Sequence, residues 1–221
     1  MWKGDGVSAI IAIDGPAGSG KSTLARLLAE ALDLPYLNTG LMYRALAARA
    51  LTQAVSPDDA SGLLALLAGI RFEMGGTRPV SLRIDGEPPA DDLVGPQVEA
   101  AVSTVARHPE VRRAMRDLQR VLGRPGGVVE GRDIGEVVFP DADVKVFLIA
   151  DEGERAARRR RERGGDDAAA AALSDRDRRD ARTHAHVPPA GAVVLDTGML
   201  DVDETFTAAL AAVRARIAVD R

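Results

Sequence analysis

The stretch from Gly15 to Ser22 reads Gly-Pro-Ala-Gly-Ser-Gly-Lys-Ser and has the residue types and spacing of a P-loop. Its glycines allow backbone N–H groups to converge on a phosphate, while Lys21 can bridge β- and γ-phosphate oxygens and the Ser22 hydroxyl can hold Mg²⁺. The pattern predicts a nucleotide phosphate site made of Gly15, Pro16, Ala17, Gly18, Ser19, Gly20, Lys21, Ser22 and Thr23. The alternative, a glycine-rich turn between strand and helix that binds nothing, is disfavoured by the complete motif.

A second group of residues is also suited to phosphate. Arg44 and Arg112 lie far apart along the chain, and Arg132 directly precedes Asp133. The arginine side chain presents a planar fork that matches phosphate or carboxylate in two hydrogen bonds, so arginines from separate elements indicate a second anion site. A local Arg132–Asp133 ion pair is the alternative. A guanine-specific switch protein is disfavoured, because Asn38 is the only asparagine and no Asn-Lys-x-Asp motif exists.

Strands and helices are predicted on both sides of the P-loop. Residues 7–13 form a nearly continuous β-branched apolar run, typical of a strand buried on both faces of a parallel sheet. Leucines at helical spacing follow the P-loop from Leu24 to Leu32. Further strands are expected at 36–38, 127–130, 144–149 and 193–195, and further helices at 42–51, 60–67, 94–106, 109–122 and 203–219. This alternation indicates an α/β fold with a parallel sheet.

The region around residues 70–95 has a different pattern. Residues 70–74 and 80–84 alternate apolar with polar side chains, and Asp85-Gly86 is typical of a tight turn. We expect a small antiparallel ribbon here. Because it interrupts an α/β alternation, it is interpreted as an insertion and not as a separate domain.

The most polar stretch precedes the last predicted strand. It contains Arg155, residues 158–161, Gly164-Gly165 and residues 176–182. These residues favour a helix by propensity but carry no apolar stripe, so the helix either stands in solvent or closes over an anion. Glutamates lie nearby, so most of these arginines are expected to be solvated and no more than two to act on a ligand.

Composition limits the possible functions. The chain of 221 residues is 46% hydrophobic and 28% charged, which is typical of a globular protein of one domain. It has no cysteine, which excludes disulfides, thiolate metal sites and cysteine nucleophiles. A net charge of -4 and an aromatic content of 3% disfavour nucleic-acid binding. No apolar run is long enough to span a membrane and no signal peptide is evident, so a cytoplasmic protein is expected.

Three segments together resemble one family, the bacterial cytidylate kinases (CMP/dCMP kinases) of the nucleoside monophosphate kinase group. They are residues 13–23, which contain the P-loop, residues 36–44, Tyr-Leu-Asn-Thr-Gly-Leu-Met-Tyr-Arg, and residues 130–142, Glu-Gly-Arg-Asp-Ile-Gly-Glu-Val-Val-Phe-Pro-Asp-Ala. The third is the most discriminating, because adenylate kinases share the P-loop but not that block. The resemblance covers nearly the whole chain.

The resemblance implies a role for each of several residues. It implies that Lys21, Arg132, Asp133 and Arg158 are catalytic, and that the substrate is bound by Thr39, Tyr43, Arg44, Ser103, Arg112, Arg132, Asp133, Arg176, Asp180 and Arg182. Arg44 and Arg132 would hold the acceptor phosphate. Thr39, Arg112 and Asp133 would face the cytosine, and Ser103, Asp180 and Arg176 would reach the ribose.

The chain departs from the family pattern at several positions. The last arginine of residues 176–182 comes one residue early, so that Thr183 holds its expected place, and residues 184–189 also differ. Val94 stands where an arginine is common. Two histidines, His184 and His186, are interpreted as surface residues and not as metal ligands, because no third ligand accompanies them.

The resemblance implies a three-layer α/β P-loop core within a single domain, residues 7–221, that contains a monophosphate-binding insertion at 63–106 and a lid at 153–183. The implied reaction is phosphoryl transfer from ATP, with Mg²⁺, to CMP or dCMP, giving ADP and CDP or dCDP. The protein is expected to be a monomer without a nucleic-acid or membrane partner. The alternatives are a P-loop kinase for another small acceptor, such as UMP, AMP or shikimate, and a non-catalytic ATP- or RNA-binding module.

Overall fold

The computed structural model describes residues 9–162 and 187–219. Three residues predicted to bind substrate, Arg176, Asp180 and Arg182, lie outside them, as do Thr183, His184 and His186. Within the described ranges, no helix has the length and apolar character needed to cross a membrane.

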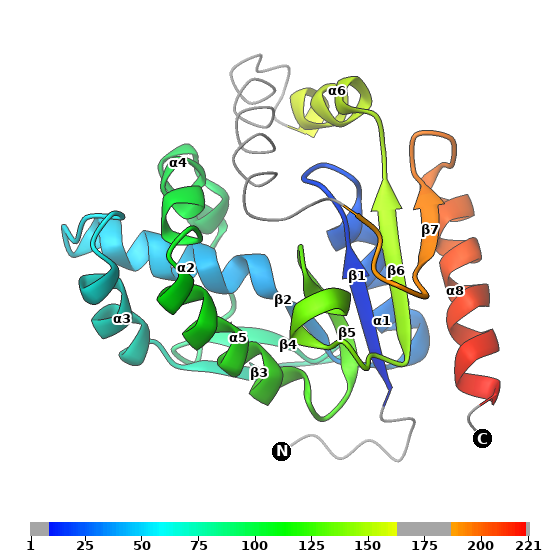
Figure 1. The fold of residues 1–221 in the computed structure, drawn as a ribbon, viewed down its shortest axis with the longest axis horizontal. Coiled ribbons are helices and arrows are strands. Elements are labelled where there is room, and N and C mark those ends of the chain that lie inside the picture. Colours follow the sequence, from blue (N-terminus) through cyan, green and yellow to red (C-terminus); the bar gives the residue numbers. More distant parts are fainter. Residues whose placement is uncertain (1–8, 163–186, 220–221) are drawn as a thin grey trace.

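In the described residues, seven strands form one sheet in the order β3-β4-β2-β5-β1-β6-β7. Their bounds are Ile10–Asp14 (β1), Tyr36–Asn38 (β2), Phe72–Gly75 (β3), Ser81–Ile84 (β4), Gly127–Glu130 (β5), Val144–Ile149 (β6) and Val193–Asp196 (β7). All pairs are parallel except β3 with β4. The predicted α/β class with a parallel sheet is therefore confirmed (Figure 1).

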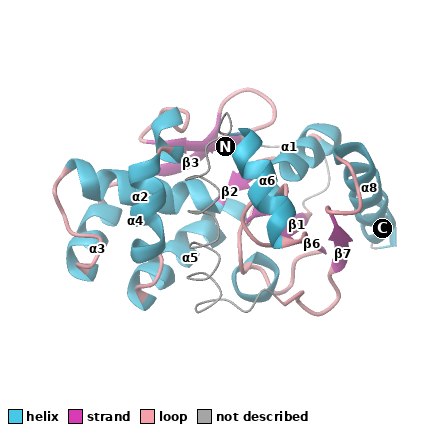
Figure 2. Ribbon diagram, turned by 90° about the horizontal axis from the view of Figure 1, so that it is seen from above, coloured by secondary structure: helices cyan, strands magenta, loops and turns pink. Residues whose placement is uncertain are grey.

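Helices cover both faces of the sheet (Figures 1 and 2). The helices are Lys21–Leu32 (α1), Thr39–Thr52 (α2), Ala60–Ala68 (α3), Pro96–Val105 (α4), Pro109–Gly123 (α5), Glu152–Glu162 (α6) and Val202–Val219 (α8). The sheet and its two helical layers give the three-layer arrangement that the sequence predicts.

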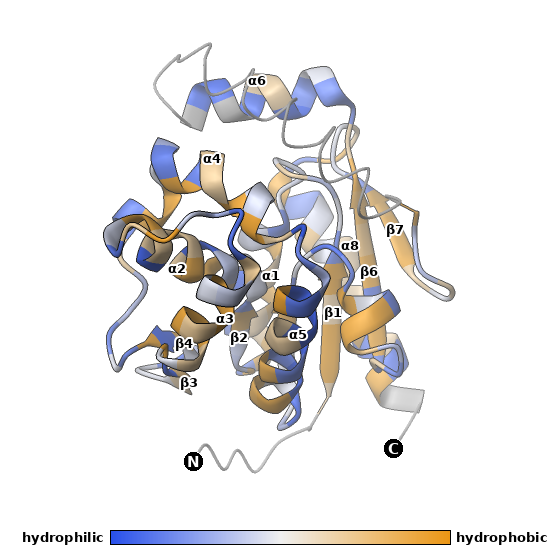
Figure 3. Ribbon diagram, turned by 60° about the vertical axis from the view of Figure 1, so that its left-hand side comes forward, coloured by the Kyte–Doolittle hydropathy of each residue, from blue (hydrophilic) through white to orange (hydrophobic). Residues whose placement is uncertain are grey.

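The alternation of side chains along β1 divides the core in two. Ala12 faces a cluster formed with α2 to α5, whereas Ile11 and Ile13 face a cluster formed with α1 and α8. All three residues are fully buried. Figure 3 shows apolar colour along β1, β6 and β7, in contrast to the polar α6. The strand that leads into the P-loop is therefore held from both sides.

The β3–β4 ribbon forms an edge of the central sheet. Met74 pairs with Leu82 in the antiparallel ribbon, and Ser81 pairs in parallel with Tyr36 of β2. Asp85 and Gly86, with φ of 55° and 90°, form the predicted tight turn. This turn follows β4, whereas the connection between β3 and β4 lies at residues 76–80.

The helix predicted at 94–106 begins two residues later than expected. Pro96 is at the first helical position of α4, and a short 3-10 turn, Asp91–Val94 (η1), precedes it. Proline fixes its own φ at a helical value and disfavours helix in the residue before it, so Gly95 separates the two elements.

Candidate functional site

The P-loop, residues 15–22, joins the carboxyl end of β1 to α1. Gly15 has φ of 149°, and a Cβ atom there would lie 2.5 Å from the Leu148 carbonyl oxygen, so only glycine fits. The Lys21 ammonium group donates a hydrogen bond to the Pro16 carbonyl over 2.6 Å. The Ser19 hydroxyl is buried and has no hydrogen-bond partner in the described residues. The loop therefore has the strained, glycine-dependent shape that its sequence predicts.

A buried carboxylate, Glu130, lies beside the P-loop at the end of β5. Ser22 Oγ donates a hydrogen bond to Glu130 Oε2 over 3.0 Å, and the Tyr36 hydroxyl donates to Oε1. Burial raises the pKa of both Glu130 and Tyr36 above their ordinary values, while Lys21 and Arg132 oppose the rise at Glu130. An acid in this position is poised to bind a cation.

These two oxygen groups fit Mg²⁺. Mg²⁺ prefers oxygen ligands, and in P-loop proteins it is held by the loop serine and one acid, with phosphates and waters as its other ligands. No group of three or more His, Cys, Asp or Glu side chains that could hold a metal occurs in residues 9–162 and 187–219. Ser22 and Glu130 would hold the ion, and Glu130 is not among the residues predicted from the sequence to do so.

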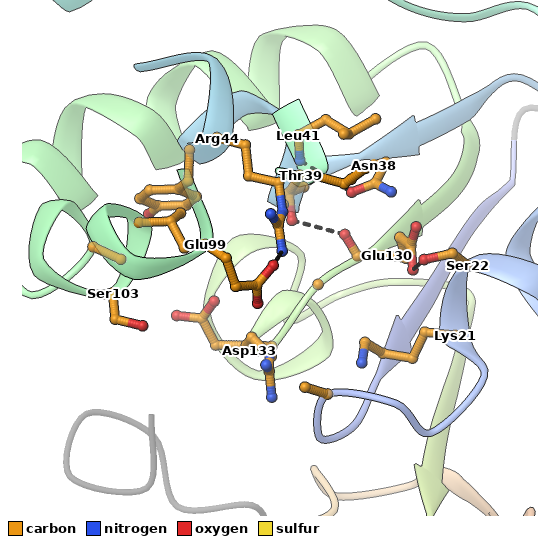
Figure 4. A pocket seen from close by; sticks show the side chains of 18 of the residues that line it. Lys21, Ser22, Asn38, Thr39, Leu41, Arg44, Glu99, Ser103, Glu130 and Asp133 are labelled. Carbon is orange, nitrogen blue, oxygen red and sulfur yellow. Dashed lines mark hydrogen bonds and ion pairs between the residues drawn. The ribbon is translucent and has the colours of Figure 1, made fainter. Parts of the chain in front are cut away.

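A pocket of about 270 Å³ opens between the P-loop and the α2–α4–α5 side of the molecule. It brings together eleven of the residues predicted from the sequence, which are Ala17, Gly18, Lys21, Ser22, Thr39, Tyr43, Arg44, Ser103, Arg112, Arg132 and Asp133. Figure 4 shows the side chains of Lys21, Arg44, Ser103 and Asp133 converging on one space. Residues from both of the anion sites expected from the sequence therefore line one pocket.

Asp133 and two arginines of α5 form an ion-pair group at the pocket wall. Asp133 Oδ2 lies 3.0 Å from Arg112 Nη2 and 3.3 Å from Arg116 Nη2. The side chains are largely buried, with 15% of Asp133 and 12% of Arg112 exposed. Burial and Asp133 raise the pKa of nearby Tyr43 to about 12, although Arg112 opposes the rise, so Tyr43 is a neutral phenol at neutral pH.

On the α4 side, Arg44 is held by two groups. Its Nη1 donates to the Leu93 carbonyl over 3.1 Å, and its Nη2 donates to Glu99 Oε2 over 2.6 Å. One helical turn beyond Glu99, the Ser103 hydroxyl is buried and has no hydrogen-bond partner in the described residues. Thr39 Oγ1 donates to the Glu130 carbonyl over 2.7 Å, which commits its proton and leaves its lone pairs for a ligand.

Asp14, the last residue of β1, ties the P-loop to the segment after Asp133. Its two carboxylate oxygens accept hydrogen bonds from the amides of Ile134 and Gly135 over 2.8 and 2.7 Å. Burial raises the pKa of Asp14 to about 6, although the two amide hydrogen bonds oppose the rise. Asp14 thereby fixes the position of the P-loop relative to the pocket wall that carries Asp133.

Two arginines of the predicted lid contact the P-loop side of the molecule. Arg155 is buried and donates to the carbonyls of Ala150 and Ala17 over 3.0 and 3.1 Å. Arg158 donates to the Thr197 hydroxyl over 3.0 Å and to the Thr197 carbonyl. Arg158, predicted to be catalytic, is not among the residues that line the pocket. Its role at the reacting phosphate stays a prediction.

The sequence analysis missed three residues of the site. Glu130 and Asp14 each end a buried strand at the edge where the P-loop begins, and a lone acid at a strand end is a usable signal. Glu99 has no such signal, since an acid in the first turn of a helix is ordinary.

Residues 11–215 match the model of a family described as cytidylate kinase. A protein named cytidylate kinase from Pelotomaculum thermopropionicum is 42% identical over 216 residues, covering 93% of this chain and 96% of that protein. Another of that name, from Solibacter usitatus, is 42% identical over 220 residues, covering 94% and 93%.

Some relatives are longer. A bifunctional pantoate ligase/cytidylate kinase from Synechococcus sp. is 43% identical over 208 residues, which are 88% of this chain but 38% of that protein. A solved shikimate kinase from Bacteroides thetaiotaomicron aligns with 94% of this chain and 96% of its own at 12% identity and a TM-score of 0.44, a similarity that carries no argument about substrate. The family match and the relatives of equal length are decisive: the chain belongs to the cytidylate kinase family.

Proposed function

We propose that this protein transfers a phosphoryl group from ATP, with Mg²⁺, to CMP or dCMP, giving ADP and CDP or dCDP in pyrimidine nucleotide metabolism. The observation that carries the proposal is the single pocket in which the P-loop lysine faces Arg44, Arg132 and Asp133. Membership of the cytidylate kinase family supports the same reaction. In a kinase the transferred phosphate of ATP must lie next to the phosphate of the acceptor. One pocket with cationic side chains at both ends allows this arrangement.

The donor half holds the triphosphate. Backbone amides of the P-loop and the α1 N-terminus bind phosphate oxygens, and Lys21 supplies the positive charge between them. Ser22 and Glu130 hold Mg²⁺, which when bound neutralises charge on the phosphates. Glu130 must be ionised for this. Burial raises its pKa and opposes ionisation, whereas the Tyr36 hydrogen bond and the adjacent Lys21 favour the ionised form.

The acceptor half holds the monophosphate. Arg44 and Arg132 bind its phosphate, and Ser103 meets the ribose. Cytosine offers an N4 donor with O2 and N3 acceptors, so the Asp133 carboxylate and the Arg112 guanidinium, 3.0 Å apart, match its edge. Uracil presents an oxygen in place of N4, which a carboxylate would repel, and this supports a preference for cytosine.

No general base is required. An acceptor phosphate oxygen is already anionic at neutral pH, so the protein contributes position and electrostatic stabilisation of the charge that spreads over the transferred group. Closure of residues 153–183 over both substrates would exclude water and so suppress hydrolysis of ATP. Arg158 lies on this segment and is the arginine proposed to reach the transferred phosphate.

The test is an ADP-release assay with MgATP and five acceptors: CMP, dCMP, UMP, AMP and shikimate. We expect acceptor-dependent turnover that is fastest with CMP or dCMP, with Lys21→Ala protein as the control for contaminating kinases. Preference for another acceptor would replace the proposed substrate. ATP binding without turnover of any acceptor would contradict the proposed reaction, and salt-sensitive RNA binding would then favour the non-catalytic alternative.

The remaining proposals concern organisation. We propose a cytoplasmic monomer without a membrane or nucleic-acid partner, in which residues 7–221 form one domain that contains a monophosphate-binding insertion at 63–106 and a lid at 153–183. Sedimentation equilibrium at several protein concentrations would test the monomer. A mass of twice 23.3 kDa would overturn it.

A further inference from the structure

The acceptor half of the pocket contains a carboxylate bonded to the arginine that is proposed to bind the acceptor phosphate. Arg44 Nη2 donates to Glu99 Oε2 over 2.6 Å, and both side chains line the pocket. Figure 4 shows Glu99 reaching from α4 to the end of Arg44. An acid in the place where an anionic substrate must bind needs an explanation.

The pair is largely withdrawn from water. The side chain of Arg44 is 9% exposed and that of Glu99 is 13% exposed. At this depth the attraction between opposite charges and the repulsion between like charges are both stronger than at the surface. A phosphate that binds the Arg44 guanidinium is therefore brought close to the negative charge of Glu99.

Glu99 is not needed merely to orient Arg44. The Arg44 Nη1 group is already fixed by the neutral Leu93 carbonyl, 3.1 Å away. The amide oxygen of a glutamine would accept the same hydrogen bond from Nη2 as the carboxylate does. What glutamate adds over glutamine at this position is its negative charge.

The α4 helix does not require this charge either. Glu99 lies in the first turn of α4, where an acid gains modestly from the helix dipole. Its carboxylate accepts a hydrogen bond from Arg44, which lies on α2 and not on α4. Its position is thus determined by the pocket and not by capping.

We infer that Glu99 is a specificity-determining residue that occupies Arg44 in place of the acceptor phosphate. The inference rests on the proposed function, because it requires Arg44 to bind that phosphate. A small anion gains too little to displace the carboxylate, whereas a nucleoside monophosphate also gains its base and ribose contacts. The Arg44–Glu99 ion pair therefore lowers the affinity for the nucleoside monophosphate. It also prevents phosphate compounds that lack the nucleoside from binding at Arg44.

The test is Glu99→Gln, compared with wild type and with Glu110→Gln. Glu110 is an exposed acid in the first turn of α5, so its variant loses the same charge outside the pocket. For Glu99→Gln we expect the KM for CMP to fall about five- to thirtyfold, the change that follows when about 1 to 2 kcal/mol of competing interaction is removed. The KM for ATP should stay within about twofold of wild type.

A second measurement isolates the phosphate. Cytidine has the base and ribose but no phosphate, so its inhibition constant as a competitor of CMP should be the same in wild type and Glu99→Gln. If cytidine binding improves as much as CMP binding, the charge acts on the whole pocket and the inference is wrong. An unchanged or higher KM for CMP would equally overturn it.

The activity of wild-type protein on CMP distinguishes failure of the proposed function from failure of this inference. If wild-type protein does not phosphorylate CMP, the proposed function fails and this inference falls with it. If wild type is active but Glu99→Gln shows no fall in KM, only the inference fails. Thermal unfolding checks that the variant is folded, and if it is not, Glu99→Ser takes its place with the same expected fall.

Discussion

The Arg155 guanidinium donates a hydrogen bond from Nη1 to the backbone carbonyl of Ala17, 3.1 Å away, although 138 positions separate the two residues. Ala17 belongs to the P-loop and Arg155 to α6, the first helix of the proposed lid. This contact fixes the base of α6 against the loop that is proposed to bind ATP. Arg155 belongs to a stretch whose arginines were expected to be mostly solvated, and it thus supports the proposed nucleotide site.

Replacing Arg155 should weaken the fold and the nucleotide site together. In Arg155→Met the carbonyls of Ala17 and Ala150 lose buried donors, so we expect a loss of about 2 to 4 kcal/mol in the free energy of unfolding and a higher KM for ATP. Urea denaturation and steady-state kinetics measure both. Arg161→Met is the matched control, because Arg161 is exposed on the same helix. Equal effects of the two variants would contradict the anchoring role.

Replacing the P-loop lysine should remove catalysis without unfolding the protein. In Lys21→Ala we expect kcat to fall about a thousandfold or more, because the positive charge that bridges the β- and γ-phosphate oxygens is removed. The free energy of unfolding should change by less than about 1 kcal/mol, since the Lys21 side chain is only half-buried at the pocket wall. Full activity of this variant would remove the P-loop from the reaction.

Asp133 should affect the acceptor far more than ATP. In Asp133→Ala the arginines Arg112 and Arg116 lose their partner, and we expect kcat/KM for CMP to fall about a hundredfold while the affinity for ATP changes less than about threefold. Kinetics with CMP and titration with ATP separate the two effects. Equal losses on both sides would place Asp133 outside the acceptor site.

The stability of the protein should depend on pH through Asp14. Its pKa rises from the ordinary 3.8 to about 6 on folding, so between pH 4 and 6 the folded protein binds more protons than the unfolded chain. The contribution of Asp14 to the free energy of unfolding is therefore highest below pH 4 and falls by roughly 3 kcal/mol as the pH rises through 6. Denaturation at several pH values should show this slope in wild type and a flatter profile in Asp14→Asn. Parallel profiles would contradict the assignment.

Removing the charge of Glu130 should alter the response to magnesium. In Glu130→Gln one of the Tyr36 and Ser22 hydroxyls can still donate to the amide oxygen and the other can accept from the amide NH2 group, but one negative charge beside the P-loop is lost. We expect the Mg²⁺ concentration for half-maximal activity to rise about tenfold. Glu136→Gln removes a charge outside the described pocket lining and should leave the Mg²⁺ response unchanged. A normal Mg²⁺ response of Glu130→Gln would exclude this carboxylate as a ligand.

The parts of the fold that depend on local patterns were predictable. The apolar run before Asp14, the leucine spacing after the P-loop and the Asp85-Gly86 turn all act within a few residues, and each appears where expected. The pairing of β4 with β2 was not predictable in the same way. It depends on contacts between segments that are distant in sequence, and no spacing rule encodes it.

The residues of the candidate site also differ in whether local sequence patterns could predict them. Lys21 and Asp133 could be predicted as site residues because each lies within a recognisable motif of neighbouring residues in the sequence. Glu99 could not, since its importance comes only from the Arg44 side chain that folding brings to it. Residue types inside a motif therefore indicate a site well, whereas the charges that tune the site require the structure.

The position of β1 in the sheet has a consequence for biosynthesis. β1 lies between β5 and β6, so its two neighbours, Gly127–Glu130 and Val144–Ile149, are translated long after it. At about 5 to 20 residues per second, the strand that carries the P-loop waits on the order of ten seconds or more on the ribosome before either partner exists. During that time its apolar side chains have no sheet to join, which makes the nascent N-terminal segment a natural client for chaperones.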